Sequence, residues 1–84
     1  MWTVHIEKTV LKRLKRIPNP DHARICQAIL DLEDKPEQLD IKPLVNRDCY
    51  RLRVADWRLL LDIDEENKIF SVHALAPRGD VYKK

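Results

Sequence analysis

Apolar and polar residues alternate along four stretches of this chain, which is typical of β-strands that bury one face. The alternating stretches are Trp2–Ile6, Cys49–Val54, Trp57–Ile63 and Ile69–Ala76. In the last stretch we expect three residues to face the core, namely Phe70, Val72 and Ala74. His73, which lies between two of them, is then expected to face outward.

Two further stretches have apolar residues at helical spacing. The first contains Val10, Leu11, Leu14 and Ile17, and the second contains Ile25, Ala28, Ile29 and Leu32. Pro18 ends the first helix, and Asn19 is expected to cap a second helix that ends near Asp34. Pro20 in its first turn and Asp21 near the positive end of its dipole fit that assignment. Because the link between the helices is short, they are expected to form an antiparallel hairpin.

The order of these elements is βααβββ, with a loop expected from Pro36 to Asp48. This order predicts an α+β fold, in which an N-terminal strand and a helical hairpin pack on a mostly antiparallel four-stranded sheet. A chain of 84 residues has the length of one small domain, so residues 1–84 are expected to form a single domain.

Three arginines surround the turn that is predicted between the second and third strands. If Ala55 and Asp56 form a two-residue turn, Arg53 lies directly opposite Arg58, and Arg51 shares their face of the sheet. Like charges that face each other across a sheet destabilise it. We therefore expect the cluster to bind an anion, and phosphate matches the geometry of guanidinium groups.

Composition narrows the choice of function only slightly. The net charge is +2, but basic residues crowd the N-terminal region, so a basic face is feasible despite near-neutrality. Cys26 and Cys49 lack metal-ligand spacing and are expected to be free thiols, and the three histidines are scattered. No metal or other cofactor is therefore expected. The chain shows no signal peptide or transmembrane stretch, which favours a cytoplasmic protein without a membrane partner.

The order βααβββ and three segments together resemble the RelE branch of the RelE/ParE toxin superfamily. The segments are Cys49–Val54, Asp56–Leu60 and Pro77–Lys83. The resemblance spans nearly the whole chain and implies the toxin of a type II toxin–antitoxin system. It further implies a metal-independent endoribonuclease that cuts mRNA in the ribosomal A site and thereby inhibits translation. The implied partners are a cognate antitoxin and, only through that antitoxin, operator DNA.

The resemblance also implies roles for individual residues. Arg58 matches the arginine that holds the scissile phosphate. Arg78 matches the arginine that stabilises the transition state or protonates the leaving 5′ oxygen. Tyr82 matches the tyrosine that orients the substrate, stacks on a base or helps to activate the 2′-hydroxyl. Arg51 and Arg53 stand where the best-known members have lysines, and they are expected to bind RNA phosphates.

The proton acceptor for the 2′-hydroxyl is the open question of this assignment. Arginine keeps its proton at any useful pH, so it serves poorly as a base. The remaining candidates are Tyr82, His73, a ribosomal group or no efficient base at all. His73 is expected on the same face as the arginines, where it is expected to bind RNA or phosphate together with them, and imidazole exchanges protons near neutral pH. Two other functions stay open: a ParE-like toxin that poisons DNA gyrase, and a catalytically weak protein that binds antitoxin as a co-repressor.

Overall fold

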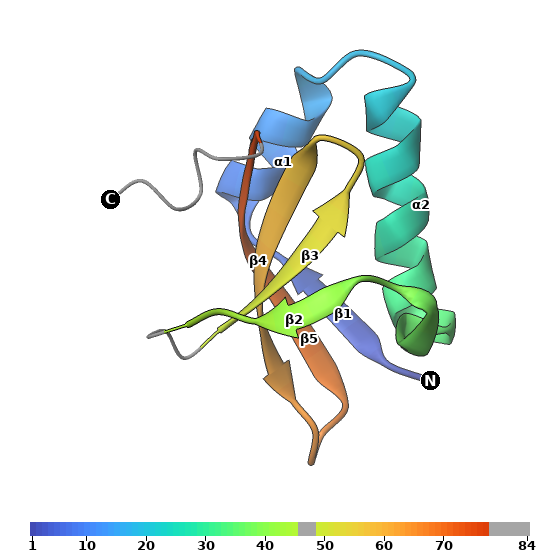
Figure 1. Ribbon diagram of the computed structural model, residues 1–84, viewed down its shortest axis with the longest axis vertical. Helices are drawn as coiled ribbons and strands as arrows, with labels where there is room; N and C mark the ends of the chain where they lie inside the picture. Colours follow the sequence, from blue (N-terminus) through green and yellow to red (C-terminus); the bar gives the residue numbers. More distant parts are fainter. Residues whose placement is uncertain (46–48, 78–84) are drawn as a thin grey trace.

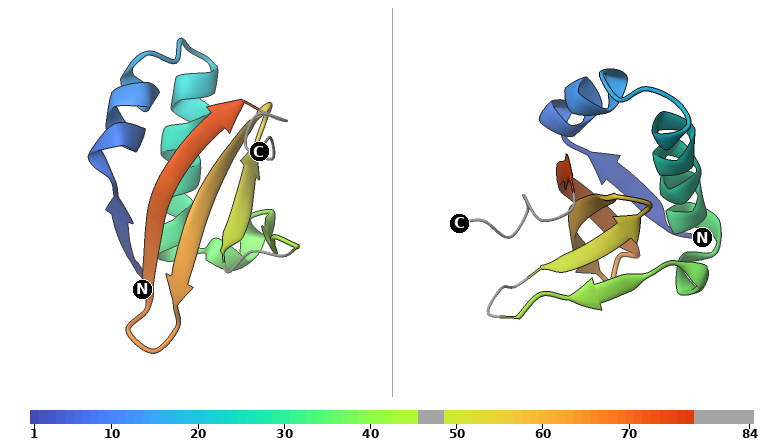
Figure 2. Two further views of the ribbon diagram at one scale, coloured as in Figure 1. Left: turned by 90° about the vertical axis from the view of Figure 1, so that its left-hand side faces the viewer. Right: turned by 45° about the horizontal axis from the view of Figure 1, so that its top comes forward.

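The computed structural model describes residues 1–45 and 49–77, which form two helices on one face of a sheet (Figures 1 and 2). The elements are β1 (Thr3–Ile6), α1 (Lys8–Lys15), α2 (Asp21–Asp34), the 3₁₀-helix η1 (Pro36–Gln38), β2 (Ile41–Pro43), β3 (Tyr50–Val54), β4 (Trp57–Asp64) and β5 (Ile69–Pro77). The sheet has five strands in the order β1-β5-β4-β3-β2. Among the strands of the described residues, only β1 and β5 pair in parallel, so the expected α+β fold with a mostly antiparallel sheet is confirmed.

The expected number of strands was wrong, because β2 lies within the segment that was assigned to a loop. β2 is only three residues long, and it pairs with β3 so that Ile41 faces Leu52 and Lys42 faces Arg51. Three residues that include Pro43 are too few to show an alternating pattern, and proline is confined to sheet edges such as this one. The extra strand matters for the site because β2 lies next to β3, the strand that carries Arg51 and Arg53.

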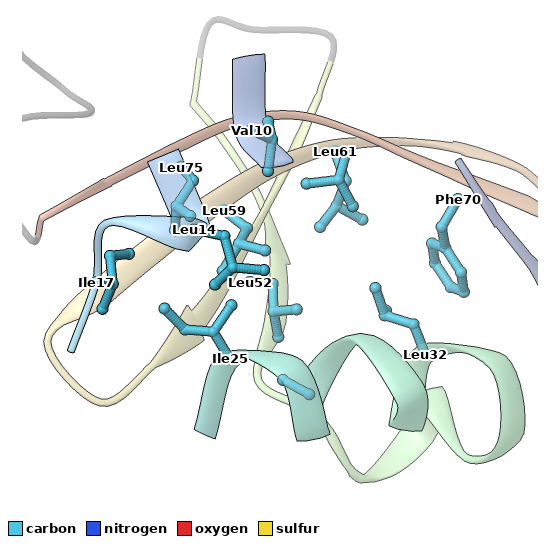
Figure 3. Close-up of a cluster of buried hydrophobic side chains, with 12 residues drawn as sticks. Val10, Leu14, Ile17, Ile25, Leu32, Leu52, Leu59, Leu61, Phe70 and Leu75 are labelled. Carbon is cyan, nitrogen blue, oxygen red and sulfur yellow. The ribbon is translucent and has the colours of Figure 1, made fainter. Parts of the chain in front are cut away.

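The core lies between the helices and the sheet (Figure 3). The helices contribute Val10, Leu14, Ile17, Ile25, Ala28 and Leu32, and the sheet contributes Leu52, Leu59, Leu61, Phe70, Val72 and Leu75. These residues are almost completely buried, and five of the sheet residues lie where the alternating pattern predicted inward side chains. Burial of a side chain of this size contributes about 1.5–3 kcal/mol, so the two layers are held together chiefly by this contact.

Leu75 takes the core place that was predicted for Ala74, because the ladder between β4 and β5 contains a bulge. Leu60 pairs with Ala74, whereas the next residue, Leu61, pairs with Val72. His73 is therefore the extra residue on β5. A bulge of this kind shifts the alternation by one residue, which turns Ala74 outward and Leu75 inward.

The beginning of α2 also differs from expectation. Asn19 is not the cap: Pro20 occupies that position, and the described residues show no side-chain cap hydrogen bond there. The carboxylate of Asp21 instead accepts a hydrogen bond of 2.9 Å from Nε1 of Trp57, at the tip of the β3–β4 hairpin. Nδ1 of His22 donates to the carbonyl of Leu14 at 2.8 Å, which joins the two helices. The start of α2 is thus fixed by contacts with neighbouring elements.

Cys26 and Cys49 are both free and half-buried, as expected. Within residues 1–45 and 49–77, no helix is long and apolar enough to cross a membrane.

Candidate functional site

The face of the sheet that points away from the helices carries basic residues in two rows across the strands. In the first row Lys42, Arg51, Leu60 and Ala74 are neighbours on β2, β3, β4 and β5. In the second row Arg53, Arg58 and Ala76 are neighbours on β3, β4 and β5. The predicted pairing of Arg53 with Arg58 is therefore confirmed, and we call Arg51, Arg53 and Arg58 the arginine face.

Two of these arginines are largely shielded from solvent. Arg58 is 8% exposed and Arg51 is 9% exposed, while Leu60 between their strands is 7% exposed. The apolar stems of arginines can cover an apolar residue such as Leu60. A guanidinium with so little water around it interacts more strongly with an anion than a surface cation does.

Arg51 has a carboxylate partner that the sequence did not reveal. Its Nη1 lies 3.5 Å from both the backbone carbonyl oxygen and the Oδ1 atom of Asp40. Asp40 directly precedes β2, and its carbonyl also accepts a 3.2 Å hydrogen bond from the backbone amide of Arg53. The short strand β2 thus places an acid beside one arginine of the face, and that charge is partly neutralised.

Arg53 has the opposite surroundings. It faces Arg58 across the β3–β4 ladder, and its buried Nε has no hydrogen-bond partner among the described residues. A buried donor without an acceptor costs about 1–3 kcal/mol. A phosphate oxygen would relieve both the missing bond and the repulsion between like charges.

His73 lies on the outward side of β5, as predicted, at the bulge described above. Its Nε2 is 3.5 Å from Oδ1 of Asp62 on β4, and its side chain is 30% exposed. Bulges re-aim side chains next to functional sites. Here the bulge places an imidazole near a carboxylate on the same face as the arginines.

Four of the six predicted site residues therefore come together on one face: Arg51, Arg53, Arg58 and His73. Arg78 and Tyr82 lie outside the described residues. Sequence reasoning missed Lys42, Asp40 and Asp62. Only recognition of β2 would have indicated the first two, whereas Asp62 could have been found from the period of β4, since it shares the outward face with Leu60.

The arrangement can bind an anion through several guanidinium groups and an amine, and it offers one imidazole for proton transfer. Within the described ranges, no three His, Cys, Asp or Glu side chains are grouped so that they could hold a metal ion.

Comparisons with known proteins identify the fold. The family model described as the ParE toxin of the type II toxin–antitoxin system parDE matches residues 4–82. A search of curated proteins found no match. Among solved structures, the chain is similar to the toxin in the archaeal RelE–RelB complex from Pyrococcus horikoshii OT3, with 29% identity and a TM-score of 0.80 over 94% of this chain and 97% of that one.

Two bacterial structures extend the comparison. The matching chain in the toxin–antitoxin complex RelBE2 from Mycobacterium tuberculosis is 25% identical to this chain in sequence. The TM-score is 0.77, and the match covers 92% of this chain and 98% of that one. The intact RelBE complex from E. coli shares the fold at 14% identity and a TM-score of 0.72, over 95% and 99% of the two chains. The family match covers nearly the whole chain, and these structures place it near RelE toxins. The chain therefore belongs to the RelE/ParE superfamily, the toxins of type II toxin–antitoxin systems.

Proposed function

We propose that this toxin is a ribosome-dependent endoribonuclease that cuts mRNA and so inhibits translation. One observation carries the proposal: Arg53 and Arg58 face each other across a hairpin, with Arg51 in the adjacent row on the same face. Such a cluster is unfavourable for the isolated sheet and favourable around a phosphate. The resemblance of the chain to RelE toxins supplies the substrate class.

Cleavage by the RNA's own 2′-hydroxyl makes three demands. The hydroxyl loses a proton as its oxygen bonds to phosphorus, the pentavalent phosphate needs positive charge, and the bond to the 5′ oxygen breaks as that oxygen gains a proton. Arg58 and Arg53 meet the second demand from the sheet. Arg78 is proposed to stabilise the transition state or protonate the leaving oxygen, and Tyr82 to orient the substrate.

His73 is the proposed proton acceptor for the 2′-hydroxyl. Its Nε2 lies 3.5 Å from Oδ1 of Asp62, and a tautomer with the proton on Nε2 would present Nδ1 as the proton acceptor. Lys42 and Arg51 extend the positive charge along the first row and are proposed to hold a neighbouring phosphate.

An antitoxin is the proposed protein partner. The similar toxins from Pyrococcus horikoshii and Mycobacterium tuberculosis were each solved in a complex with an antitoxin. By analogy, a cognate antitoxin is proposed to block this toxin and to carry it to operator DNA.

The test is primer-extension mapping of transcripts after induction, with translation running and with translation blocked. Cuts within translated codons that vanish when translation stops are expected. Cuts that persist without translation would point to a free ribonuclease. Absence of both cuts and growth arrest, with antitoxin binding preserved, would instead identify a co-repressor that has lost catalysis.

Gyrase poisoning is the second candidate function, and the description of the matching family model as ParE favours it. A gyrase poison needs no phosphate-binding cluster, so the arginine face argues against it. Induction of the DNA-damage response without mRNA cuts would decide for this alternative.

A further inference from the structure

A second basic surface lies on α1, beside the end of the sheet. A groove of about 640 Å³ is lined by Thr9, Lys12, Arg13, Arg16, Ile17 and Trp57. Three of these six residues are cations, and none of the six is acidic. Among the described residues no carboxylate lies within ion-pair distance of Lys12, Arg13 or Arg16. The groove is therefore a site of uncompensated positive charge.

The groove also has an aromatic wall that is held in place. The indole Nε1 of Trp57 donates to the carboxylate of Asp21 at 2.9 Å, and Asp21 itself is not part of the lining. This bond holds the half-buried indole ring in place at the tip of the β3–β4 hairpin. It also gives the nearby carboxylate of Asp21 a hydrogen-bond donor. A site for single-stranded nucleic acid combines two parts. One is a row of cations along the phosphate backbone of the nucleic acid, and the other is an aromatic ring on which its bases stack.

Arg13 connects this groove with the outward face of the sheet. A second hollow, of about 210 Å³, is lined by Thr9, Val10, Arg13, His73, Ala74 and Leu75. Arg13 and Thr9 line both spaces, and α1 lies beside β5 (Figure 2, left). Ala74 is the direct neighbour of Leu60, which in turn neighbours Arg51. The hollow with His73 thus lies between the arginine face and the groove on α1.

We propose that the RNA strand that is cut continues from the arginine face past His73 and Arg13 into the groove, where Arg16 and Lys12 contact its phosphates and Trp57 stacks on a base. This inference rests on the proposed function for the identity of the strand. An acidic peptide shares the negative charge of RNA, but it offers no flat ring for the indole. The groove would therefore contribute affinity only for RNA long enough to reach it.

The length of the RNA provides the test. Two probes, a trinucleotide and a single-stranded twelve-nucleotide RNA, carry 2′-O-methyl groups throughout, so that neither can be cleaved. We expect R13A/R16A to bind the longer probe about tenfold more weakly and to lower its salt slope by about 1.4, since each phosphate contact in a single strand contributes about 0.7. Binding of the trinucleotide should change less than twofold. The matched control is K15A/R24A, which removes the same net charge from exposed positions outside the groove.

Trp57 gives a second readout. In a W2F background, the long probe should quench the remaining tryptophan fluorescence, and the trinucleotide should not. Equal weakening by R13A/R16A and K15A/R24A, unchanged binding of the long probe, or absence of quenching would each overturn the inference. The inference would also be overturned if R13A/R16A lost binding to a polyglutamate peptide but bound the long RNA probe as the parent does. Neither probe can be cut, so these binding results do not depend on catalysis. The proposed function is tested separately, by asking whether R58A abolishes cleavage.

Discussion

Arg53 on β3 lies directly opposite Arg58 on β4, and the Nε atom of Arg53 is buried without a hydrogen-bond partner in the described part of the chain. Both features weaken the free protein, and both favour a bound phosphate. Stability and function should therefore respond in opposite directions when the charge of Arg53 is removed.

Arg53→Met tests this opposition, because methionine keeps the apolar stem and removes the guanidinium. The free energy of unfolding should rise by about 0.2–1 kcal/mol, since a like-charge pair across the ladder is lost. Growth arrest on induction should weaken in the same variant. Urea unfolding and a plating assay measure the two effects, and a less stable protein would show that the two arginines do not repel each other in the free state.

Arg58 is the residue on which cleavage should depend most. Arg58→Ala should lower the cleavage rate by about 10²–10³-fold, as removal of one donor to a transition-state anion does in other enzymes. Because Arg58 is 8% exposed, the alanine variant also leaves a cavity, so Arg58→Lys is the companion variant. Lysine keeps charge and stem but lacks the planar fork. Ribosome-bound mRNA cleavage is measured beside circular dichroism, and full toxicity in both variants would remove Arg58 from the site.

Asp40 should restrain the arginine face. Asp40→Asn removes the carboxylate that lies 3.5 Å from Arg51 but keeps the backbone carbonyl that contacts it. The free energy of unfolding should fall by no more than about 1 kcal/mol, because the acid is partly exposed. Affinity for an uncleavable RNA trinucleotide should increase, since the positive charge of the face is no longer partly neutralised. Fluorescence anisotropy reports the affinity, and weaker binding would mean that Asp40 mainly positions Arg51.

Ala55 forms the tip of the β3–β4 hairpin with a φ of 53°, in the left-handed region that penalises residues with a Cβ atom. Ala55→Gly should therefore raise the free energy of unfolding by about 0.5–1 kcal/mol, after the larger loss of chain entropy by glycine is included. The matched control is Ala23→Gly on the exposed side of α2, where the same change should lower stability by a similar amount. Thermal unfolding of the two variants measures the contrast, which would vanish if the turn were unstrained.

Asp64 makes the turn between β4 and β5 sensitive to acid. Its carboxylate accepts hydrogen bonds from the side chain and backbone of Asn67, at 2.9 and 3.1 Å, and these bonds lower its pKa below the ordinary value of 3.8. A carboxylate whose folded pKa is lowered stabilises the fold above its unfolded pKa, and that contribution is lost as the pH falls through the folded value. Asp64→Ala should thus be less stable than the parent at pH 6, and the difference should shrink below pH 4. Denaturation at the two pH values tests this, and a constant difference would contradict it.

The hairpin with the arginine face could be predicted from sequence because its information is local. The alternation of residues 50–54 and the two-residue turn at Ala55 and Asp56 set the pairing of Arg53 with Arg58 before any other element is known. β2 could not be predicted in the same way, because its three residues form a strand only by pairing with β3. The contact of Asp40 with Arg51 depends on that pairing and was missed with it.

The bulge at His73 was missed for a similar reason. A bulge is a mismatch between two strands, so neither the sequence of β4 nor that of β5 shows it alone. The roles of Arg78 and Tyr82 stay predictions, since both residues lie outside the described ranges. The direction of His73 was predicted correctly, although its neighbour Asp62 was not identified.

The bulge has a practical consequence for anyone who reads or redesigns β5. Before it, inward positions have even numbers, namely Phe70 and Val72, and after it they have odd numbers, beginning with Leu75. The alternation of inward and outward side chains along β5 therefore shifts by one residue, and the shift occurs at His73. An alignment that carries the first parity through to Pro77 would exchange core and surface positions in the last part of the strand. Deletion of His73 would remove the extra residue and leave a regular ladder, in which Ala74 still lies opposite Leu60 and Leu75 still faces the core opposite Leu59.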